Sequence, residues 1–308
     1  MRIAIYGSGG LGGYYGARLQ AAGEDVTFIA RGDNLAAMRA NGLKVISPLG
    51  DLHLESPQAT DDPAAVGEVD FVLVAVKTWQ IPDVAEAMRP MVGPQTVVVP
   101  FLNGVDAPYQ LADALGEEHV LGGLSRIFSY LEAPGVVKHF NDSAYVGFGR
   151  LDGQPSAAAD QLQAAFANAS VDADVTADVV KALWEKLILV SSWSGMAALA
   201  QCGLGELRDH AESRAMIDAC ISEGIAVAQA KNVPIEDEYK ARVWAFYDSL
   251  PAGASASMMR DLWGKRPSEL DAWCGAFHRF GQEIGIKTPI HSMCYMLLQP
   301  MERAARAS

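Results

Sequence analysis

A glycine-rich turn close to the N-terminus constrains the fold of this chain most strongly. The residues Gly7-Ser8-Gly9-Gly10-Leu11-Gly12 directly follow a strand-like run from Ile3 to Tyr6. They open a helix-compatible run that continues to Gly23, and a second strand-like run extends from Val26 to Ile29. This is the G-x-G-x-x-G pattern in the strand, helix and strand context that it requires, so the sequence predicts a dinucleotide-binding βαβ unit.

Each glycine of this motif has a separate physical role. Gly7 permits the tight turn, Gly9 lets the backbone approach a pyrophosphate, and Gly12 lets the helix pack closely on the strand. The free N–H groups at the start of the helix then face the phosphates. We therefore expect the whole turn to bind cofactor, including Ser8, Gly10 and Leu11. The alternative, a chance glycine-rich turn, does not explain the flanking strands and helix.

The end of the second predicted strand indicates which dinucleotide binds. An acidic residue there binds the ribose 2′-hydroxyl of NAD, whereas an arginine pairs with the 2′-phosphate of NADP. This strand ends in Ile29-Ala30-Arg31 and carries no acid at its tip. Because a guanidinium holds a phosphate through two parallel hydrogen bonds, Arg31 favours NADP(H). A solvated surface arginine is the competing interpretation.

The remaining pattern predicts an α/β domain followed by an all-α domain. Apolar strand candidates alternate with amphipathic stretches up to about residue 150, and a helix and strand complete the first domain near Thr176, which is typical of a Rossmann-type, doubly wound parallel sheet. We expect the domains to be residues 1–176 and 177–308. The further strand candidates are Phe71 to Val76 and Val97 to Val99, and the helix candidates are Ala177 to Gln201, Ala211 to Asn232, Glu236 to Ser249 and Glu269 to Gly285.

Two polar residues follow the later strands of the predicted sheet. Lys77 comes directly after the run that ends at Val76, and Asn103 follows the run that contains Val99. Since ligands of such sheets bind at the carboxyl ends of the strands, we expect both side chains beside the nicotinamide and the substrate. A solvated lysine and an ordinary Asn-Gly turn remain the alternatives from position alone.

Several motifs together resemble the ketopantoate reductases (2-dehydropantoate 2-reductases). The resemblance covers essentially the whole chain and implies NADPH-dependent reduction of a 2-keto acid in a cleft between two domains. A homodimer is also suggested by the family. Besides the glycine turn, the motifs are Val76-Lys77-Thr78-Trp79-Gln80, Leu102-Asn103-Gly104, Leu183-Trp184-Glu185-Lys186-Leu187, Gly205-Glu206-Leu207-Arg208, and Ser257-Met258-Met259-Arg260-Asp261 through Glu269-Leu270-Asp271.

The resemblance implies that Lys186 is the general acid. Hydride delivered to a carbonyl carbon leaves charge on the oxygen, which must be stabilised and protonated as it forms. Lys186 lies in an otherwise apolar segment, where desolvation would lower the pKa of its ammonium group towards a useful range. The alternative is a lysine that extends from a surface face of the helix.

Two further residues match substrate-binding positions of the family. Glu269 matches the acidic residue that hydrogen-bonds substrate hydroxyls, and Ser257 matches the serine that binds the substrate carboxylate. Both positions lie near an expected helix start, so an N-cap for Ser257 and an early helical turn for Glu269 are the competing interpretations.

Three departures from the family make its usual substrate uncertain. The family carries asparagines four and eight residues after the lysine, where this chain has Val190 and Ser194, and Leu204 replaces a third asparagine. The pocket loses amide groups and becomes more apolar, although Ser194 keeps one polar group for substrate. A bulkier or less hydroxylated 2-keto acid, an opine-type reaction, or a non-catalytic NADP(H) sensor are the alternatives.

Charge and cysteine usage exclude other classes of protein. The 308 residues include 37 acidic and 24 basic ones, a formal charge of -13 that disfavours nucleic acid and anionic membranes. The cysteines and histidines show no metal-binding spacing, so no metal is expected. No basic region with an apolar core opens the sequence, and we expect a cytoplasmic protein with reduced core thiols.

Overall fold

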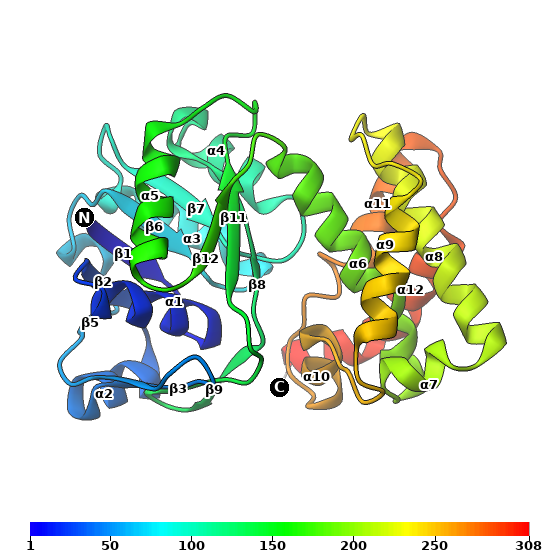
Figure 1. The fold of residues 1–308 in the computed structure, drawn as a ribbon, viewed down its shortest axis with the longest axis horizontal. Coiled ribbons are helices and arrows are strands. Elements are labelled where there is room, and N and C mark those ends of the chain that lie inside the picture. The colour runs from blue at the N-terminus through cyan, green and yellow to red at the C-terminus, as the bar shows by residue number, and fades with distance from the viewer. Residues whose placement is uncertain (308) are drawn as a thin grey trace. The chain divides into compact units, whose positions relative to one another are not determined.

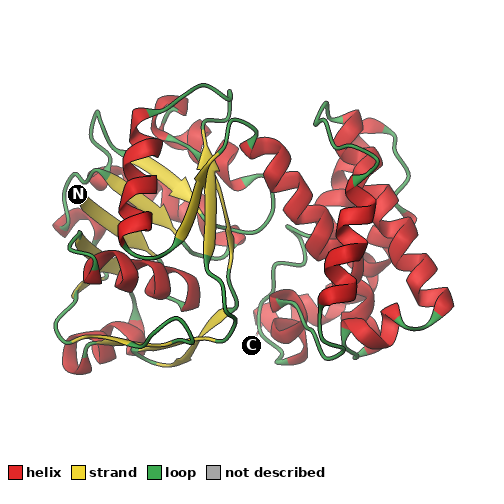
Figure 2. Ribbon diagram, in the orientation of Figure 1, coloured by secondary structure: helices red, strands yellow, loops and turns green. Residues whose placement is uncertain are grey.

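The computed structural model describes residues 1–307, which form two compact units. The N-terminal unit contains Met1–Leu102 and Asp106–Val179, and the C-terminal unit contains Asn103–Val105 and the chain from Val180 onward. Within the described residues, all strands belong to the N-terminal unit, whereas the C-terminal unit consists of helices and loops (Figure 2).

A five-stranded parallel sheet forms the centre of the N-terminal unit. Its strand order is β5-β2-β1-β6-β7 (Figure 1). Tyr6 of β1 lies opposite Ile29 of β2. The predicted strands and the doubly wound topology are therefore confirmed, although β6 ends two residues before the predicted end at Val76. The strands are β1 (Arg2–Tyr6), β2 (Asp25–Ile29), β5 (Gln58–Thr60), β6 (Phe71–Val74) and β7 (Val97–Pro100).

Helices bury both faces of this sheet. Alternate residues of β1 point to opposite faces, so Ile5 packs in one core cluster with Tyr14, while Tyr6 packs in the other with Ile81. Burial on both faces explains why these strands read as continuous apolar runs. The helices are α1 (Gly10–Ala21), α2 (Gly32–Asn41), α3 (Ile81–Met88) and α4 (Ala107–Leu115), and short 3₁₀ turns span Pro63–Ala65, Thr78–Gln80, Arg89–Met91 and Glu117–His119.

Two smaller sheets complete this unit. One has the order β4-β3-β10-β9 and the other β12-β11-β8. The first of these was not predicted, and neither were β8 and β11 of the second. The predicted helix and strand before Thr176 are confirmed as α5 and β12. These elements are β3 (Leu43–Ile46), β4 (Leu52–Leu54), β8 (Gly122–Arg126), β9 (Ser129–Ala133), β10 (Val136–His139), β11 (Tyr145–Gly149), α5 (Ala157–Asn168) and β12 (Asp172–Val175).

The C-terminal unit confirms the predicted helical pattern with one correction. The helix expected from Glu269 begins only at Cys274, because Trp273 has a non-helical backbone (φ -104°, ψ -93°) and residues 269–273 form turns. No helix among residues 1–307 is both long and apolar enough to cross a bilayer. The helices are α6 (Val179–Ala200), α7 (Leu204–Arg208), α8 (Ala211–Ala230), α9 (Tyr239–Ser249), α10 (Ser257–Trp263), α11 (Cys274–Ile284) and α12 (Pro289–Ala307).

A buried polar cluster joins α8 to the start of α12. The Glu223 carboxylate accepts hydrogen bonds from the backbone N–H groups of Ile290 (2.8 Å) and His291 (3.1 Å), so it caps α12. It also lies 2.9 Å from Nδ1 of the fully buried His291. Burial lowers the pKa of His291, although Glu223 opposes this shift, so the imidazole is neutral in the folded protein.

We expect His291 to make stability depend on pH near neutrality. Its pKa is below 6.5 in the folded state, so the unfolded chain binds more protons and the free energy of unfolding falls as pH drops below about 6.5. The slope reaches up to about 1.4 kcal/mol per pH unit for one proton. Urea unfolding between pH 7.5 and 5.5 measures it. His291→Gln should flatten this slope, and the exposed His210→Gln should not; equal slopes in all three proteins would contradict the assignment.

Candidate functional site

The glycine turn of the N-terminal unit presents an open helix start. Gly7 has a positive φ of 102°, and a Cβ atom on Gly12 would lie 2.1 Å from the Gly7 carbonyl oxygen, so both positions require glycine. By contrast, no atom lies within 4 Å of the position that a Cβ on Gly9 would occupy. Gly9 is the N-cap of α1, and no side chain caps this helix. The turn therefore fits a dinucleotide pyrophosphate against the N-terminus of α1.

Side-chain hydrogen bonds hold this turn beside β2. The buried Ser8 hydroxyl donates to the Ile29 carbonyl (3.0 Å), and Asn34 donates through Nδ2 to the Ser8 carbonyl (2.9 Å). The Ser8 hydroxyl therefore bonds within the protein, and a ligand at this turn would contact the backbone of Ser8. Arg31 is exposed and is the N-cap of α2.

Lys77 follows β6 and lies at the start of a 3₁₀ turn. Its backbone N–H donates to Oε1 of Gln80 (3.0 Å), and its side chain is half-buried. This local bond fixes the direction in which the chain leaves the sheet. The motif Lys77 to Gln80 therefore has a structural reason as well as the predicted functional one.

In the C-terminal unit, the structure brings two predicted site residues into contact. Nδ2 of Asn103 donates a 2.8 Å hydrogen bond to Oε2 of Glu269. The Glu269 side chain lies in the turn before α11, and the residue is only 4% exposed. A carboxylate this deeply buried is costly unless polar partners surround it, so its position argues for a role beyond packing.

A second carboxylate, which sequence reasoning missed, anchors the turn that carries Glu269. Glu302 of α12 accepts hydrogen bonds from the backbone N–H (2.9 Å) and the hydroxyl (2.6 Å) of Ser268. Arg306 forms an ion pair with the same carboxylate at 2.7 Å. Nothing in the spacing of Ser268 and Glu302, 34 residues apart, could have shown this contact.

Lys186 and Ser194 both lie on α6, but in different surroundings. Lys186 is half-buried, whereas Ser194 is completely buried. The Ser194 hydroxyl has no hydrogen-bond partner among residues 1–307, which leaves a polar group that a ligand or water could satisfy. Val190 and Leu204 stand at the other two positions where the family has asparagines. Val190 is half-buried, and Leu204 lies in the core.

Ser257 is the first residue of α10 and is half-buried. The N-cap is Ala256, and no side chain makes a capping hydrogen bond, so the capping interpretation of Ser257 is wrong. The early-helix interpretation of Glu269 is also wrong, since α11 begins five residues later. Neither helix capping by Ser257 nor an early helical turn at Glu269 therefore explains the presence of these residues.

The buried cluster of Cys220, Glu223 and His291 has the residue types of a metal site. Their possible ligand atoms lie within 4.8 Å of one another. However, Glu223 is engaged in capping α12, and the Cys220 sulfur is almost equidistant from Nδ1 (3.4 Å) and Nε2 (3.5 Å) of His291. A sulfur so placed lies off both in-plane lone-pair directions. These contacts are those of a structural cap.

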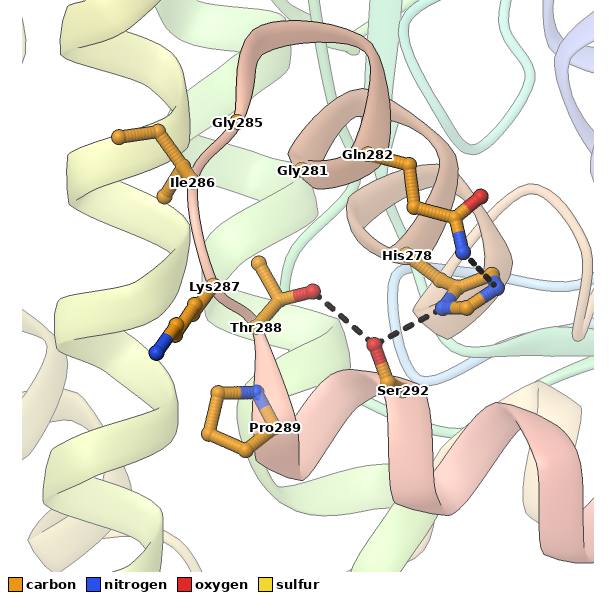
Figure 3. Close-up of a pocket in the computed structure, with 9 residues that line it drawn as sticks. All are labelled: His278, Gly281, Gln282, Gly285, Ile286, Lys287, Thr288, Pro289 and Ser292. Carbon is orange, nitrogen blue, oxygen red and sulfur yellow. Dashed lines mark hydrogen bonds between the residues drawn. The ribbon is translucent and has the colours of Figure 1, made fainter.

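An open pocket of about 420 Å³ lies between the end of α11 and the start of α12 (Figure 3). Its polar groups bond to one another: His278 to Ser292 (2.8 Å), Ser292 to Thr288 (3.1 Å) and Gln282 to His278 (3.2 Å). None of the predicted site residues lines it. Its lining residues are His278, Gly281, Gln282, Gly285, Ile286, Lys287, Thr288, Pro289 and Ser292.

We expect Glu302→Ala to destabilise the protein by about 2 kcal/mol, because it leaves the Ser268 donors buried without an acceptor. Denaturant unfolding measures this change. The matched control is Arg303→Ala, which removes an exposed side chain from the next position of the same helix. Equal unfolding free energies for the two variants would show that the Glu302 contacts do not hold the turn.

Comparison with known proteins places both units in one family. Residues 3–153 match the family model of ketopantoate reductase PanE/ApbA, and residues 178–302 match the model of its C-terminal domain. An uncharacterized oxidoreductase of Bacillus subtilis, YkpB, is 28% identical over 302 residues, covering 98% of this chain and 99% of that protein.

Solved structures agree with this assignment. The 2-dehydropantoate 2-reductase of Geobacter metallireducens is 33% identical, with a TM-score of 0.91 over 97% of this chain and 99% of that one. A D-mandelate dehydrogenase solved with NADH and anilino(oxo)acetate has the same fold (TM-score 0.91, 99% and 100% covered) at 22% identity. This chain therefore belongs to the ketopantoate reductase family, the NADP-dependent oxidoreductases that act on CH–OH groups.

Proposed function

We propose that this protein reduces a 2-keto acid to a 2-hydroxy acid with NADPH, and that the substrate is 2-dehydropantoate, which yields pantoate for pantothenate biosynthesis. The observation that carries this proposal is the buried hydrogen bond between Asn103 and Glu269. Both residues match family site positions, and their contact keeps a carboxylate and an amide in place where packing alone would favour apolar side chains.

The N-terminal unit would hold the cofactor. The pyrophosphate would lie on the open start of α1 at Gly9 and Gly10, and Arg31 would pair with the 2′-phosphate. Lys77, at the carboxyl end of β6, would lie beside the nicotinamide half. NADPH, when bound, supplies the hydride that is transferred to the keto carbon.

The C-terminal unit would supply the proton and hold the substrate. The Lys186 ammonium would stabilise the oxygen on which negative charge develops and then donate its proton to it. The Ser257 hydroxyl would bind the substrate carboxylate, and the Glu269 carboxylate would accept hydrogen bonds from substrate hydroxyls. Asn103 orients Glu269 through the 2.8 Å hydrogen bond.

A second candidate substrate is a more apolar branched 2-keto acid. Val190, Ser194 and Leu204 stand where the family has asparagines, and the buried Leu204 has no polar atom to offer a substrate hydroxyl. A pocket without amide partners would leave such a hydroxyl unpaired, which costs binding energy. An opine-type reaction shares the same acid and cofactor, and a non-catalytic NADP(H) sensor needs neither Lys186 nor Glu269.

We expect Lys186→Ala to lower kcat by about 10²- to 10⁴-fold, because the developing oxyanion loses its proton donor. NADPH binding, measured by nicotinamide fluorescence, should be unchanged. The matched control is Lys181→Ala on the same helix, which removes the ion pair with the exposed Glu236 and should leave kcat close to that of the wild type. Loss of kcat in both variants would point to damage to α6 rather than to an acid.

The second candidate predicts a measurable substrate preference. Branched 2-keto acids without the terminal hydroxyl should show a kcat/KM about tenfold above that of 2-dehydropantoate, the size expected for one mismatched polar group in an apolar pocket. Steady-state assays of NADPH consumption across such a panel test it. Equal values for 2-dehydropantoate and its close analogues would remove the second candidate, and tight NADPH binding without any turnover would favour the sensor.

A further inference from the structure

The Tyr6 side chain ends in a buried hydroxyl whose proton has no acceptor among the residues that the structure describes. Tyr6 is the last residue of β1 and is 2% exposed. Its hydroxyl makes no hydrogen bond of normal geometry with any of residues 1–307. An unsatisfied buried hydroxyl costs on the order of 1–3 kcal/mol, and a phenylalanine would fill the same space without this cost.

The charged group that faces this hydroxyl is Arg31. Tyr6 lies opposite Ile29 in the β1–β2 register, and Arg31 follows Ile29 by two residues. Burial raises the pKa of Tyr6, and the positive charge of Arg31, together with a side-chain hydrogen bond from it, opposes this rise. The phenol is therefore protonated at neutral pH. Arginine has no acceptor, so the proton of the Tyr6 hydroxyl still lacks one.

A helix start lies at the same place. Arg31 is the N-cap of α2, a ten-residue helix, and no side chain makes a capping hydrogen bond there. No atom lies within 4 Å of the position that a Cβ on Gly32, the first residue of α2, would occupy. The first-turn N–H groups of such a helix attract anions. Asp33, exposed in the same turn, contributes the one opposing charge on this stretch of helix.

We propose that the Tyr6 hydroxyl, the Arg31 guanidinium and the N-terminus of α2 form one phosphate subsite, in which Tyr6 donates a hydrogen bond to the 2′-phosphate of NADP(H). This inference rests on the proposed function and adds a second side chain to the arginine that the strand end alone indicated. A phosphate monoester carries about -1.5 to -2 charges and three acceptor oxygens at neutral pH, which matches a cation, a phenol and backbone N–H donors.

The same arrangement selects against NADH. A ribose 2′-hydroxyl is neutral and offers far weaker acceptance than a phosphate oxygen, and it would leave the guanidinium without a counter-ion. Tyr6 would therefore increase the preference for NADPH over NADH and would have little effect on binding of the nicotinamide group that both cofactors share.

The chain offers a matched control in Tyr14. This tyrosine of α1 is fully buried, its hydroxyl is also unpartnered, and an arginine, Arg18, lies over its ring at 5.2 Å. It packs in the core cluster on the other face of the central sheet from Tyr6. Tyr14→Phe thus removes a buried phenol hydroxyl of the same chemistry away from the proposed phosphate subsite.

The test compares wild type, Tyr6→Phe and Tyr14→Phe in the full chain, with dissociation constants for NADPH and NADH from nicotinamide fluorescence. We expect Tyr6→Phe to weaken NADPH binding about tenfold or more, as for one hydrogen bond to a charged group, and to leave NADH binding unchanged. Tyr14→Phe should change neither. Thermal unfolding without ligand should show both variants at least as stable as wild type, which excludes misfolding as the cause.

Adenosine 2′,5′-bisphosphate and adenosine 5′-monophosphate serve as probes of the subsite itself. Displacement of NADPH by the bisphosphate should weaken in Tyr6→Phe, and displacement by the monophosphate should not. Unchanged NADPH affinity in Tyr6→Phe, or equal loss for NADPH and NADH, would overturn the inference while NADPH-dependent reduction by the wild type still supported the proposed function. A wild type that binds no NADPH would overturn both.

Discussion

The N-terminal unit depends on the close approach of α1 to the turn that follows β1. At Gly12 a single added carbon would lie 2.1 Å from the Gly7 carbonyl oxygen, so any side chain there would push the helix away from the sheet. The same helix start is tight on its other side, where a Cβ on Gly10 would lie 2.5 Å from Cα of Tyr130 in β9. The central sheet and the sheet that contains β9 therefore both pack directly against the backbone of α1, at positions where only glycine fits. The N-terminus of α1 stays open at Gly9.

The C-terminal unit solves a different problem, because it must keep polar groups ordered inside a helical core. Glu302 fixes the turn at Ser268, and the next residue, Glu269, receives the Asn103 amide. Glu223 caps α12 and contacts His291 in the interior. Each buried carboxylate is satisfied by named donors, as burial of a charge requires. The formal charge of -13 repels anions over most of the surface. The protein can therefore bind an anionic cofactor or substrate only where local hydrogen-bond donors and cations outweigh this negative potential.

The sequence predicted the elements whose signals are local. The glycine turn, the strands β1, β2, β6 and β7, and the long helices α6 and α8 follow from spacing and apolar periodicity within a few residues of their observed bounds. The helix assigned from Glu269 began too early because Leu270, Trp273 and Phe277 keep helical spacing through a segment that forms turns. The sheet of β3, β4, β9 and β10 was missed because its strands have only three to five residues, and β3 pairs with β10 across 92 positions, as Val45 does with Val137.

The contacts within the candidate site could not be predicted in the same way. Asn103 and Glu269 were each identified from motifs, yet their hydrogen bond spans 166 positions and is visible only in the structure. Nothing in the sequence distinguishes Tyr6 from other strand residues, and the lack of an acceptor for its hydroxyl is visible only in the structure. The most direct test is transfer of deuterium from NADPH that carries deuterium at both C4 positions of the nicotinamide, with 2-dehydropantoate and other 2-keto acids as acceptors and the product examined by NMR. Hydride transfer to a 2-keto acid predicts deuterium on carbon 2 of a 2-hydroxy acid; cofactor oxidation without deuterium at that carbon, or no product from any 2-keto acid, would contradict the proposed function.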